Sequence, residues 1–319
     1  MSGTDGAGVA NLKVVYIVGP GRSGSTLLGD ILAQSSDVVH VGELFLYWKR
    51  REMMPPSRCG CGRPIPECPF WTAVTDYSHW ATDVDSAMAD EIYSLGSSRH
   101  WPMLWWQGRS GQEVWPNYGD RLAKLYEAIA EVSGARVIID SSKQPGPALV
   151  LANLKGIDPY FIHLTRDPRA VVRSWKTAKH DAVSPADALE ALPPIRVTLN
   201  WSARALAAEL LVASRARPRG YKRLAWESFV KSPQATYRDV MRFIGEPPSS
   251  SAFVDDHSVH VQPSHTIAGN PGRREGGVRK ICLDEAWREE LTSKERVAIA
   301  AASAPMMLRL GYPLDSKVH

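Results

Sequence analysis

Short apolar and β-branched runs recur along the chain, and each is followed by a stretch with helical spacing of its apolar residues. The runs cover Val14–Gly19, Val137–Asp140, Tyr160–Leu164 and Lys222–Trp226, with a weaker one at Val38–Val41. Runs of this length between turn residues predict strands, and their alternation with helices is typical of βαβ units. The pattern therefore predicts an α/β fold, with a parallel β-sheet flanked by helices on both faces.

The alternation stops between Met53 and Tyr118, where Pro, Gly, Cys and Trp dominate. We interpret residues 53–118 as an aromatic and cysteine-rich cap insertion over the carboxyl edge of the sheet, because open α/β sheets bind ligands there. The tryptophans of Trp101–Pro116 have two interpretations. They shape an acceptor pocket, or they fill a small satellite core, since tryptophan is commonly well buried.

Composition narrows the class of partner. The 319 residues are 44% hydrophobic, which suits one large domain. We expect a flexible N-terminus at 1–12 and a single domain at 13–319. The 38 Lys and Arg against 34 Asp and Glu leave a net charge of +4, too mild for a nucleic-acid partner. No run reaches the ~18 apolar residues of a membrane span and no signal peptide is visible, so we predict a cytoplasmic protein.

The loop GPGRSGSTLL at Gly19–Leu28 lies between the first predicted strand and a helix. Its glycines let successive backbone N–H groups and the helix N-terminus converge on an anion. In the triphosphate-binding loop G-x-x-x-x-G-K-[ST], a lysine reaches the terminal phosphates. Here Gly19 and Gly24 keep the spacing and Thr26 takes the last position, but Ser25 replaces the lysine. The loop therefore suits a smaller anionic group than a triphosphate.

Arg22 supplies the charge that this loop lacks at the lysine position. Its planar guanidinium suits two-point contact with a single phosphate or sulfate. Without a ligand, the same glycines would simply make a tight turn between strand and helix. We expect the anion to be bound by Gly21, Arg22, Ser23, Gly24, Ser25 and Thr26.

A second candidate anion site follows the strand at Tyr160–Leu164. In the run Thr165–Lys176, Asp167–Pro168 is a good helix start, since Asp caps helices and Pro suits the first helical position. Arg166 then extends from the strand end, and Ser174 lies about two turns into the helix. Taken alone, the run could equally be an exposed basic helix.

Together, these two segments resemble the family of sulfotransferases that use the nucleotide donor PAPS. The resemblance is to bacterial members that are similar to tyrosylprotein sulfotransferases. The resemblance implies that the glycine-rich loop holds the 5′-phosphosulfate, while Arg166 and Ser174 hold the 3′-phosphate. It also implies the reaction, transfer of a sulfuryl group from PAPS to a hydroxyl or amine with release of PAP and no need for a metal. The acceptor would be a small molecule, a glycan or a lipid-like compound.

Two later segments extend the resemblance. Lys222–Gly245 looks like the family's R-Y-E-D-L strand and following helix, with Trp226 in place of the tyrosine of the nucleotide site. Ser264–Gly277 resembles the basic, glycine-containing loop that closes over the nucleotide. It departs from the R-K-G-x-x-G-D-W pattern of cytosolic members, so either Arg273 or Arg274 is expected at the 3′-phosphate.

The resemblance also suggests the catalytic groups. Asp37–Trp48 is similar to the region of tyrosylprotein and related sulfotransferases in which a glutamate follows a short strand and a glycine, which implies Glu43 as the general base. The segment Asp140–Pro147 lacks the histidine of cytosolic members but keeps Lys143, a cation for the transferring group. Glu43 could instead only support a helix start. His40 is a second candidate base.

Three of the four cysteines, Cys59, Cys61 and Cys68, lie in one Pro- and Gly-rich turn. Free thiols packed in a loop are the interpretation we favour. Zinc with a fourth ligand such as Cys282 or a histidine, and a local disulfide, are the alternatives. Similar cysteine patterns in bacterial members of the family imply a structural role.

Two other functions compete with sulfuryl transfer. A P-loop kinase or nucleotide hydrolase would share the loop but is disfavoured by Ser25. A nucleotide-binding protein without catalysis would share the fold, and Glu43 and Lys143 argue against it. The sequence leaves the acceptor and a possible homo-oligomer open.

Overall fold

The computed structural model describes residues 11–53, 55–79, 83–110, 112, 115–177, 192–216, 220–249 and 253–315. Residues 1–10 of the expected flexible N-terminus lie outside the described residues. The first strand begins at Leu12. No helix in the described ranges combines the length and apolar character needed to cross a bilayer.

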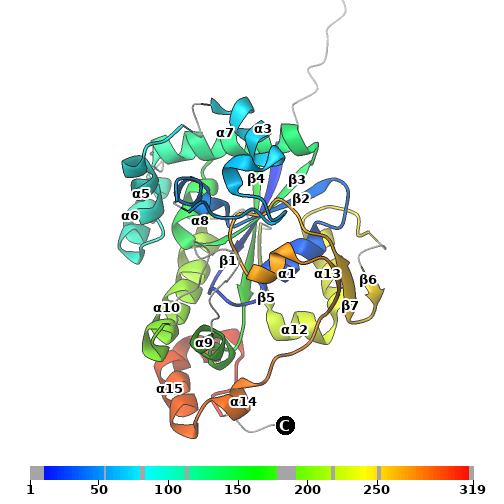
Figure 1. Cartoon of the computed structure of the whole chain (residues 1–319). Coiled ribbons are helices and arrows are strands. Elements are labelled where there is room, and N and C mark those ends of the chain that lie inside the picture. The colour runs from blue at the N-terminus through cyan, green and yellow to red at the C-terminus, as the bar shows by residue number, and fades with distance from the viewer. Residues whose placement is uncertain are drawn as a thin grey trace, which may run out of the picture.

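A five-stranded parallel sheet forms the centre of the molecule (Figure 1). Its strands are β1 (Leu12–Val18), β2 (Val38–Gly42), β3 (Val137–Lys143), β4 (Ile157–Thr165) and β5 (Tyr221–Ala225). They lie in the order β2-β3-β1-β4-β5, and each neighbouring pair is parallel. This architecture confirms the predicted α/β fold, and the five strands coincide with the five predicted runs.

Both faces of the sheet are buried, as expected for parallel strands with helical crossovers. On β1, Val15 and Ile17 enter one core with α1 (Ser25–Leu32), α12 (Trp226–Lys231) and α13 (Pro233–Phe243). The alternate residues Val14, Tyr16 and Val18 enter the opposite core, which includes α7 (Pro116–Ser133) and α8 (Pro145–Leu151). The sheet is therefore a rigid platform whose strand ends are held from both sides.

A third core lies beside the sheet and contains four helices, α9 (Pro168–Lys176), α10 (Pro194–Ala207), α14 (Trp287–Glu290) and α15 (Ser293–Leu310). Trp201 and Met307 are among its fully buried side chains. A π-helix (Ala208–Val212) and α11 (Ala213–Arg215) continue α10. Packing in this third core holds α9, the helix that follows β4, in position.

The region expected as a cap folds into short helices on the α7 side of the sheet. They are α3 (Pro69–Tyr77), α5 (Ser86–Ser94) and α6 (Trp101–Arg109), with 3-10 turns at Ile65–Glu67 and Ser98–His100. A 3-10 turn at Leu44–Leu46 and α2 (Tyr47–Arg51) precede this region. Trp71 is 1% exposed and belongs to the core under α7. Trp101 is also buried. Trp105 and Trp115 are partly buried against the same core, whereas Trp106 is 66% exposed, so the tryptophans of Trp101–Pro116 do not share one role.

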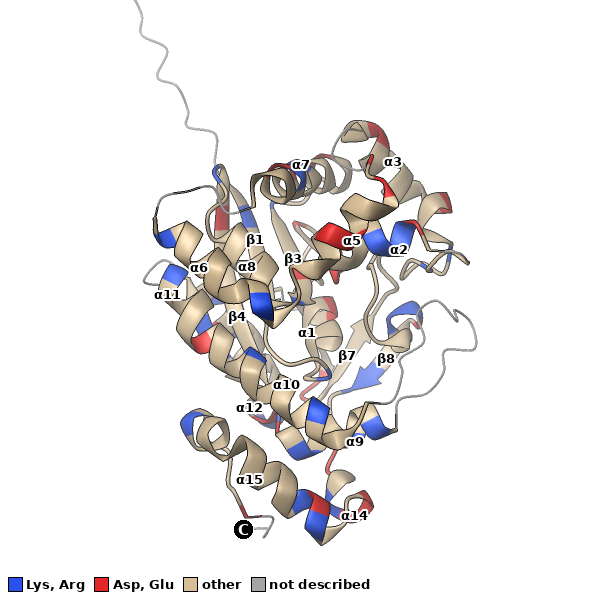
Figure 2. Ribbon diagram, turned by 90° about the vertical axis from the view of Figure 1, so that its left-hand side faces the viewer, with Lys and Arg blue, Asp and Glu red and all other residues tan. Residues whose placement is uncertain are grey.

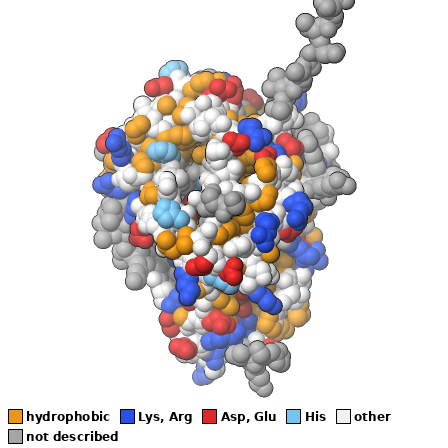
Figure 3. All heavy atoms as spheres, turned by 90° about the vertical axis from the view of Figure 1, so that its right-hand side faces the viewer, with side chains coloured by type: hydrophobic (Ala, Val, Ile, Leu, Met, Phe, Trp, Pro, Cys, Tyr) orange, Lys and Arg blue, Asp and Glu red, His pale blue; other side chains and the backbone are white. Residues whose placement is uncertain are grey.

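A small antiparallel sheet lies on the other side of the molecule (Figure 1). It consists of β6 (Phe253–Asp255), β7 (Ser258–Val261) and β8 (Gly277–Lys280), which were not predicted. Figure 3 views this side, where acidic and basic side chains are interspersed rather than gathered in one basic field.

Between β7 and β8, residues 264–270 form an irregular segment, here called the bridging segment, followed by a 3-10 turn at Pro271–Arg274. Ile267 forms a parallel bridge to Gly42, at the end of β2. Its N–H donates to the Val41 carbonyl at 2.8 Å, and its carbonyl accepts from the Glu43 N–H at 2.7 Å. The bridging segment thereby extends the main sheet beside β2.

Candidate active site

The carboxyl end of β1 is the point where the connections of the sheet diverge. Helix α1, after β1, lies on one face, whereas α8, after β3, lies on the other. Such divergence opens a crevice at the carboxyl ends of the two strands. The strand ends are joined by a hydrogen bond from the Gly19 N–H to the Lys143 carbonyl, 3.1 Å long. A pocket of about 480 Å³ lies there. In Figure 2, basic residues mark α9, α10 and β8, which contribute to this pocket.

The glycine-rich loop has the shape that its sequence predicts. Gly24 has a φ of +89°, and a Cβ placed on it would lie 2.3 Å from the ring of Trp226. Only glycine avoids both the backbone strain and this clash. Arg22 is also left-handed, with a φ of 65°. The loop thus delivers Ser25 and Thr26 to the N-terminus of α1, where backbone N–H groups favour anions.

Strained backbone is concentrated around this pocket. Four non-glycine residues in the described ranges have positive φ, and two of them, Arg22 and Lys143, line it. A third, Ala268, precedes the pocket-lining Gly269. Strain of this kind persists where the surrounding structure enforces it and gathers at functional sites.

The two predicted anion-binding segments meet in the pocket. The Arg22 Nε donates to Ser174 Oγ at 2.9 Å, and Arg166 Nη1 donates to the Arg22 carbonyl at 3.3 Å. Arg166 also lies 3.3 Å from the Asp284 carboxylate, which Arg173 contacts at 3.0 Å. Loop and helix therefore form one site rather than two.

Glu43 and Lys143 form an ion pair in the pocket. Their Oε1 and Nζ atoms are 2.6 Å apart, and both side chains line the pocket. The Lys143 Nζ further donates to the Ser141 carbonyl at 3.1 Å. Glu43 follows β2 directly and Lys143 ends β3, so neighbouring strand ends position both groups.

His40, the second candidate base, is a packed core residue. Its Nδ1 lies 2.8 Å from the Asp30 carboxylate and its Nε2 lies 3.1 Å from Ser141 Oγ. The ring is 1% exposed and does not line the pocket. This arrangement leaves Glu43 as the carboxylate base candidate facing the pocket.

The pocket carries a clear excess of positive charge. Its charged lining residues are the cations Arg22, Lys143, Arg166, Arg204 and Arg279 and the single carboxylate Glu43. Burial and the neighbouring Arg166 lower the pKa of Arg22. Burial also lowers the pKa of Arg204. A bound anion would offset both the crowding and the desolvation of these cations.

Ser23, in the same loop but not among the residues that line the pocket, has an unsatisfied polar group. The residue is 1% exposed, and its Oγ has no hydrogen-bond partner within the described part of the chain. Buried hydroxyls in folded proteins are normally hydrogen-bonded. The residues of the loop thus fit an anionic ligand that accepts hydrogen bonds.

Several pocket residues were not predicted from the sequence. They are Leu46, Tyr93, Gln144, Trp175, Arg204, Asn270 and Arg279. Arg204 lies in α10 and carries no motif. By contrast, the buried Arg273 donates to the Gly269 and Arg58 carbonyls at 3.3 and 2.9 Å. Neither Arg273 nor Arg274 is among the lining residues, whereas Arg279 of β8 is. The one sequence signal for Arg279 is the alternation of side chains in a short strand, which sends every second residue to the same face.

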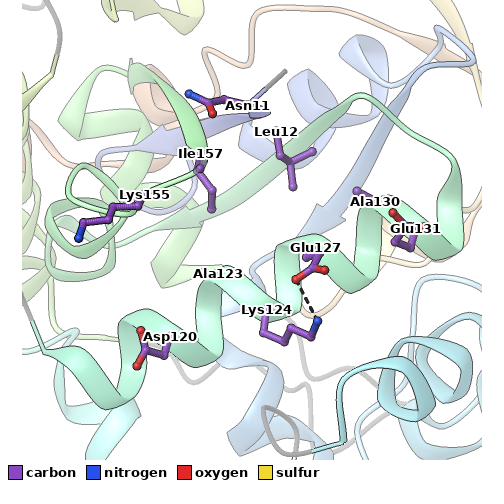
Figure 4. Close-up of a pocket in the computed structure, with 11 residues that line it drawn as sticks. Asn11, Leu12, Asp120, Ala123, Lys124, Glu127, Ala130, Glu131, Lys155 and Ile157 are labelled. Carbon is purple, nitrogen blue, oxygen red and sulfur yellow. Dashed lines mark hydrogen bonds and ion pairs between the residues drawn. The ribbon is translucent and has the colours of Figure 1, made fainter. Parts of the chain in front are cut away.

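A larger cavity of about 770 Å³ lies at the opposite end of the sheet, between α7 and the starts of β1 and β4 (Figure 4). Its lining mixes the acids Asp120, Glu127 and Glu131 with two lysines, and Lys124 pairs with Glu127 at 3.0 Å. Amino ends of parallel strands are not where such sheets bind ligands. The smaller pocket is therefore the candidate active site.

The three clustered cysteines lie outside this pocket and approach a histidine from the bridging segment. The ligand atoms of Cys59, Cys61, Cys68 and His265 all lie within 4.8 Å of one another. Cys282 is exposed and is not part of the group.

Fold and pocket together define an α/β protein with a cation-lined pocket at the end of its first strand. The model of the sulfotransferase family matches residues 15–250, so the chain belongs to the sulfotransferase family.

Solved structures agree with this assignment at the level of the fold. The sulfotransferase domain of the Synechococcus PCC 7002 olefin synthase has a TM-score of 0.53 at 16% identity, with 99% of this chain and 100% of that chain covered. The sulfotransferase domain from the curacin biosynthetic pathway has a TM-score of 0.56 at 15% identity, with 95% and 99% covered. No matching sequence was found among curated proteins.

Proposed function

We propose that this sulfotransferase takes its sulfuryl group from PAPS and passes it to a hydroxyl or amine of an acceptor, releasing PAP. The observation that carries the proposal is the charge of the pocket, five cations and one carboxylate around a loop that lacks the triphosphate lysine. A donor with separate anionic groups at its 5′ and 3′ ends matches cations spread over several elements.

The residues of the loop would hold the 5′ end of the donor. Arg22 and the Ser23 hydroxyl, together with the N-terminus of α1, supply donors there. Arg166 and Ser174 would bind the 3′-phosphate, which would compete with Asp284 for Arg166. Arg279 is the cation of β8 placed to assist, in addition to the predicted Arg273 and Arg274. Trp226 packs on Gly24 and keeps the loop in its binding shape.

Glu43 would act as the general base and Lys143 as the stabilising cation. In the reaction, the acceptor oxygen or nitrogen bonds to sulfur as the bond from sulfur to the 5′-phosphate oxygen breaks, and Glu43 takes the acceptor proton. Lys143 holds the Glu43 oxygen at 2.6 Å and offers positive charge at the end of β1, where negative charge builds.

The acceptor would contact the uncharged side chains of the pocket. Leu46, Tyr93 and Trp175 line it, and Trp175 also borders a neighbouring cavity of about 120 Å³. Aromatic faces bind flat rings, sugars and aliphatic chains. We therefore retain a small-molecule, glycan or lipid-like acceptor.

Thermal stabilisation by nucleotides tests the donor assignment. A ligand at roughly 100 times its Kd stabilises the native state by about 2.7 kcal/mol. We expect PAP to raise the melting temperature without Mg²⁺, and AMP, which lacks the 3′-phosphate, to do so much less. Stabilisation by ATP only in the presence of Mg²⁺ would contradict the proposal and favour a kinase or hydrolase. Binding of PAP without transfer to any of a panel of acceptors would favour a non-catalytic protein.

A further inference from the structure

We propose that Cys59, Cys61, Cys68 and His265 bind one Zn²⁺ ion as a closed structural site. Cys59, Cys61 and Cys68 come from the turn before α3, and His265 comes from the bridging segment, so the ion would join two regions far apart in the sequence. A Cys₃His set with four protein ligands is a common structural zinc site and leaves no open position for catalysis.

Three of the six distances between ligand atoms are close to those of a tetrahedron around zinc, and all six are within 4.8 Å. Zinc–sulfur bonds of about 2.3 Å and zinc–nitrogen bonds of about 2.0 Å put the ligand atoms roughly 3.5 to 3.8 Å apart. The Cys61 and Cys68 sulfurs are 3.7 Å apart, and the His265 Nδ1 lies 3.8 Å from the Cys59 sulfur and 3.2 Å from the Cys68 sulfur. A disulfide would bring two sulfurs to about 2.05 Å.

The surroundings hold these side chains in position. The His265 ring stacks on Phe70 with centroids 4.8 Å apart and planes within 6°. The His265 carbonyl accepts from the Trp71 indole at 2.9 Å. Cys59 and Cys68 are fully buried. Such outer contacts orient metal ligands.

The backbones of the two regions are in direct contact beside the cluster. The Gly60 N–H donates to the Thr266 carbonyl at 2.9 Å. A Cβ on Gly60 would lie 2.3 Å from the Ser264 carbonyl oxygen, so glycine permits this approach. The ion would hold together two segments that already fit closely.

The far end of the bridging segment lines the candidate active site. Gly269 and Asn270 face the pocket, and Ile267 binds the backbone N–H of Glu43. The ion would therefore also fix the pocket wall and the Glu43 backbone. This second consequence rests on the proposed function, whereas the metal site itself does not.

Metal analysis of the purified full chain tests the site directly. We expect about one zinc per chain by elemental analysis and native mass spectrometry. Protein grown with cobalt should show the visible absorption of tetrahedral, thiolate-bound Co²⁺. Cys61→Ser and His265→Ala should each retain less than about a tenth of the metal after dialysis. His265→Cys, which restores a fourth ligand, should retain it.

Cys282→Ser is the matched control, because this exposed cysteine lies outside the cluster. It should keep its zinc and the wild-type melting temperature. Metal-free protein with reduced thiols, a Cys61–Cys68 disulfide in the intact mass, or bound iron instead of zinc would each overturn the proposal. A zinc-loaded protein that fails to bind PAP would refute the donor assignment alone.

Discussion

The two ends of the bridging segment face sites of opposite character. At Gly269 and Asn270 the segment borders an open pocket whose cations outnumber its one carboxylate. At His265, whose ring stacks on Phe70, it enters a cluster whose four candidate ligand atoms lie within 4.8 Å of one another. The first site has positive charge that the protein itself does not neutralise. The second has four candidate ligands, enough to complete the coordination of one ion.

This difference shows how one segment can border both a site that binds and releases a ligand and a site with a structural role. A site that binds and releases a ligand needs charge and hydrogen-bonding capacity that the protein itself does not satisfy. A structural site needs the reverse, ligands fully used by one ion. The middle of the segment, at Ile267, ties both to the main sheet through β2. Variants that alter one site and spare the other are the way to test this division.

The largest expected effect is on turnover. Glu43→Gln keeps the size of the side chain but removes the base, so we expect turnover to fall by about 10²–10⁴-fold. Affinity for PAP and zinc content should stay close to wild type, because Glu43 touches neither the predicted 3′-phosphate site nor the cluster. Single-turnover transfer and calorimetry measure the two quantities. Near-normal turnover would remove Glu43 from the chemistry.

A smaller effect is expected from Gly24→Ala. The substitution forces alanine into a φ of +89° and displaces the Trp226 ring, whereas Gly134→Ala meets the strain of a φ of +68° with nothing within 4 Å. We expect about 1 kcal/mol of destabilisation for Gly134→Ala and roughly 3 kcal/mol for Gly24→Ala, with PAP binding lost only in the latter. Chemical unfolding and calorimetry provide the comparison. Equal effects would mean that the packing of Trp226 on the loop is immaterial.

The smallest expected effect is on affinity, from Arg166→Ala. Loss of one charge-assisted contact should weaken PAP binding by roughly ten-fold, about 1.5 kcal/mol, with little change in stability. Arg169 is the matched control, because it is buried against Asp167 at 2.6 Å and stacks on Trp287 away from the pocket. Arg169→Ala should cost about 3 kcal/mol of stability and leave the PAP affinity of the folded protein unchanged. Weaker PAP binding in Arg169→Ala, with a loss of stability alone in Arg166→Ala, would contradict these assignments.

The parts of the molecule governed by local rules could be predicted from the sequence. Apolar runs identified all five strands of the main sheet, and Asp167 caps α9 as its sequence suggests, accepting from the Arg169 N–H. The family resemblance assigned Arg22 and Ser174 to the two ends of one nucleotide, and the two side chains are in contact.

The remaining parts depend on tertiary contacts. Arg204 reaches the pocket only because α10 packs beside α9, and helical periodicity does not reveal which residue that packing aims inward. His265 meets the cysteines because residues 264–270 run beside β2, across a sequence separation that no local pattern reports. Arg273 is basic and near the right place, yet it is used to bind backbone carbonyls.

The pairing of Ile267 beside β2 also bears on how the protein avoids association during its synthesis. β2 is the edge strand of the main sheet, and an uncovered edge offers unpaired N–H and carbonyl groups to any other chain. The bridging segment covers the carboxyl end of that edge, but it is synthesised more than 200 residues after β2. Until it docks, the backbone groups at this end of β2 are open to strand pairing with a neighbouring chain.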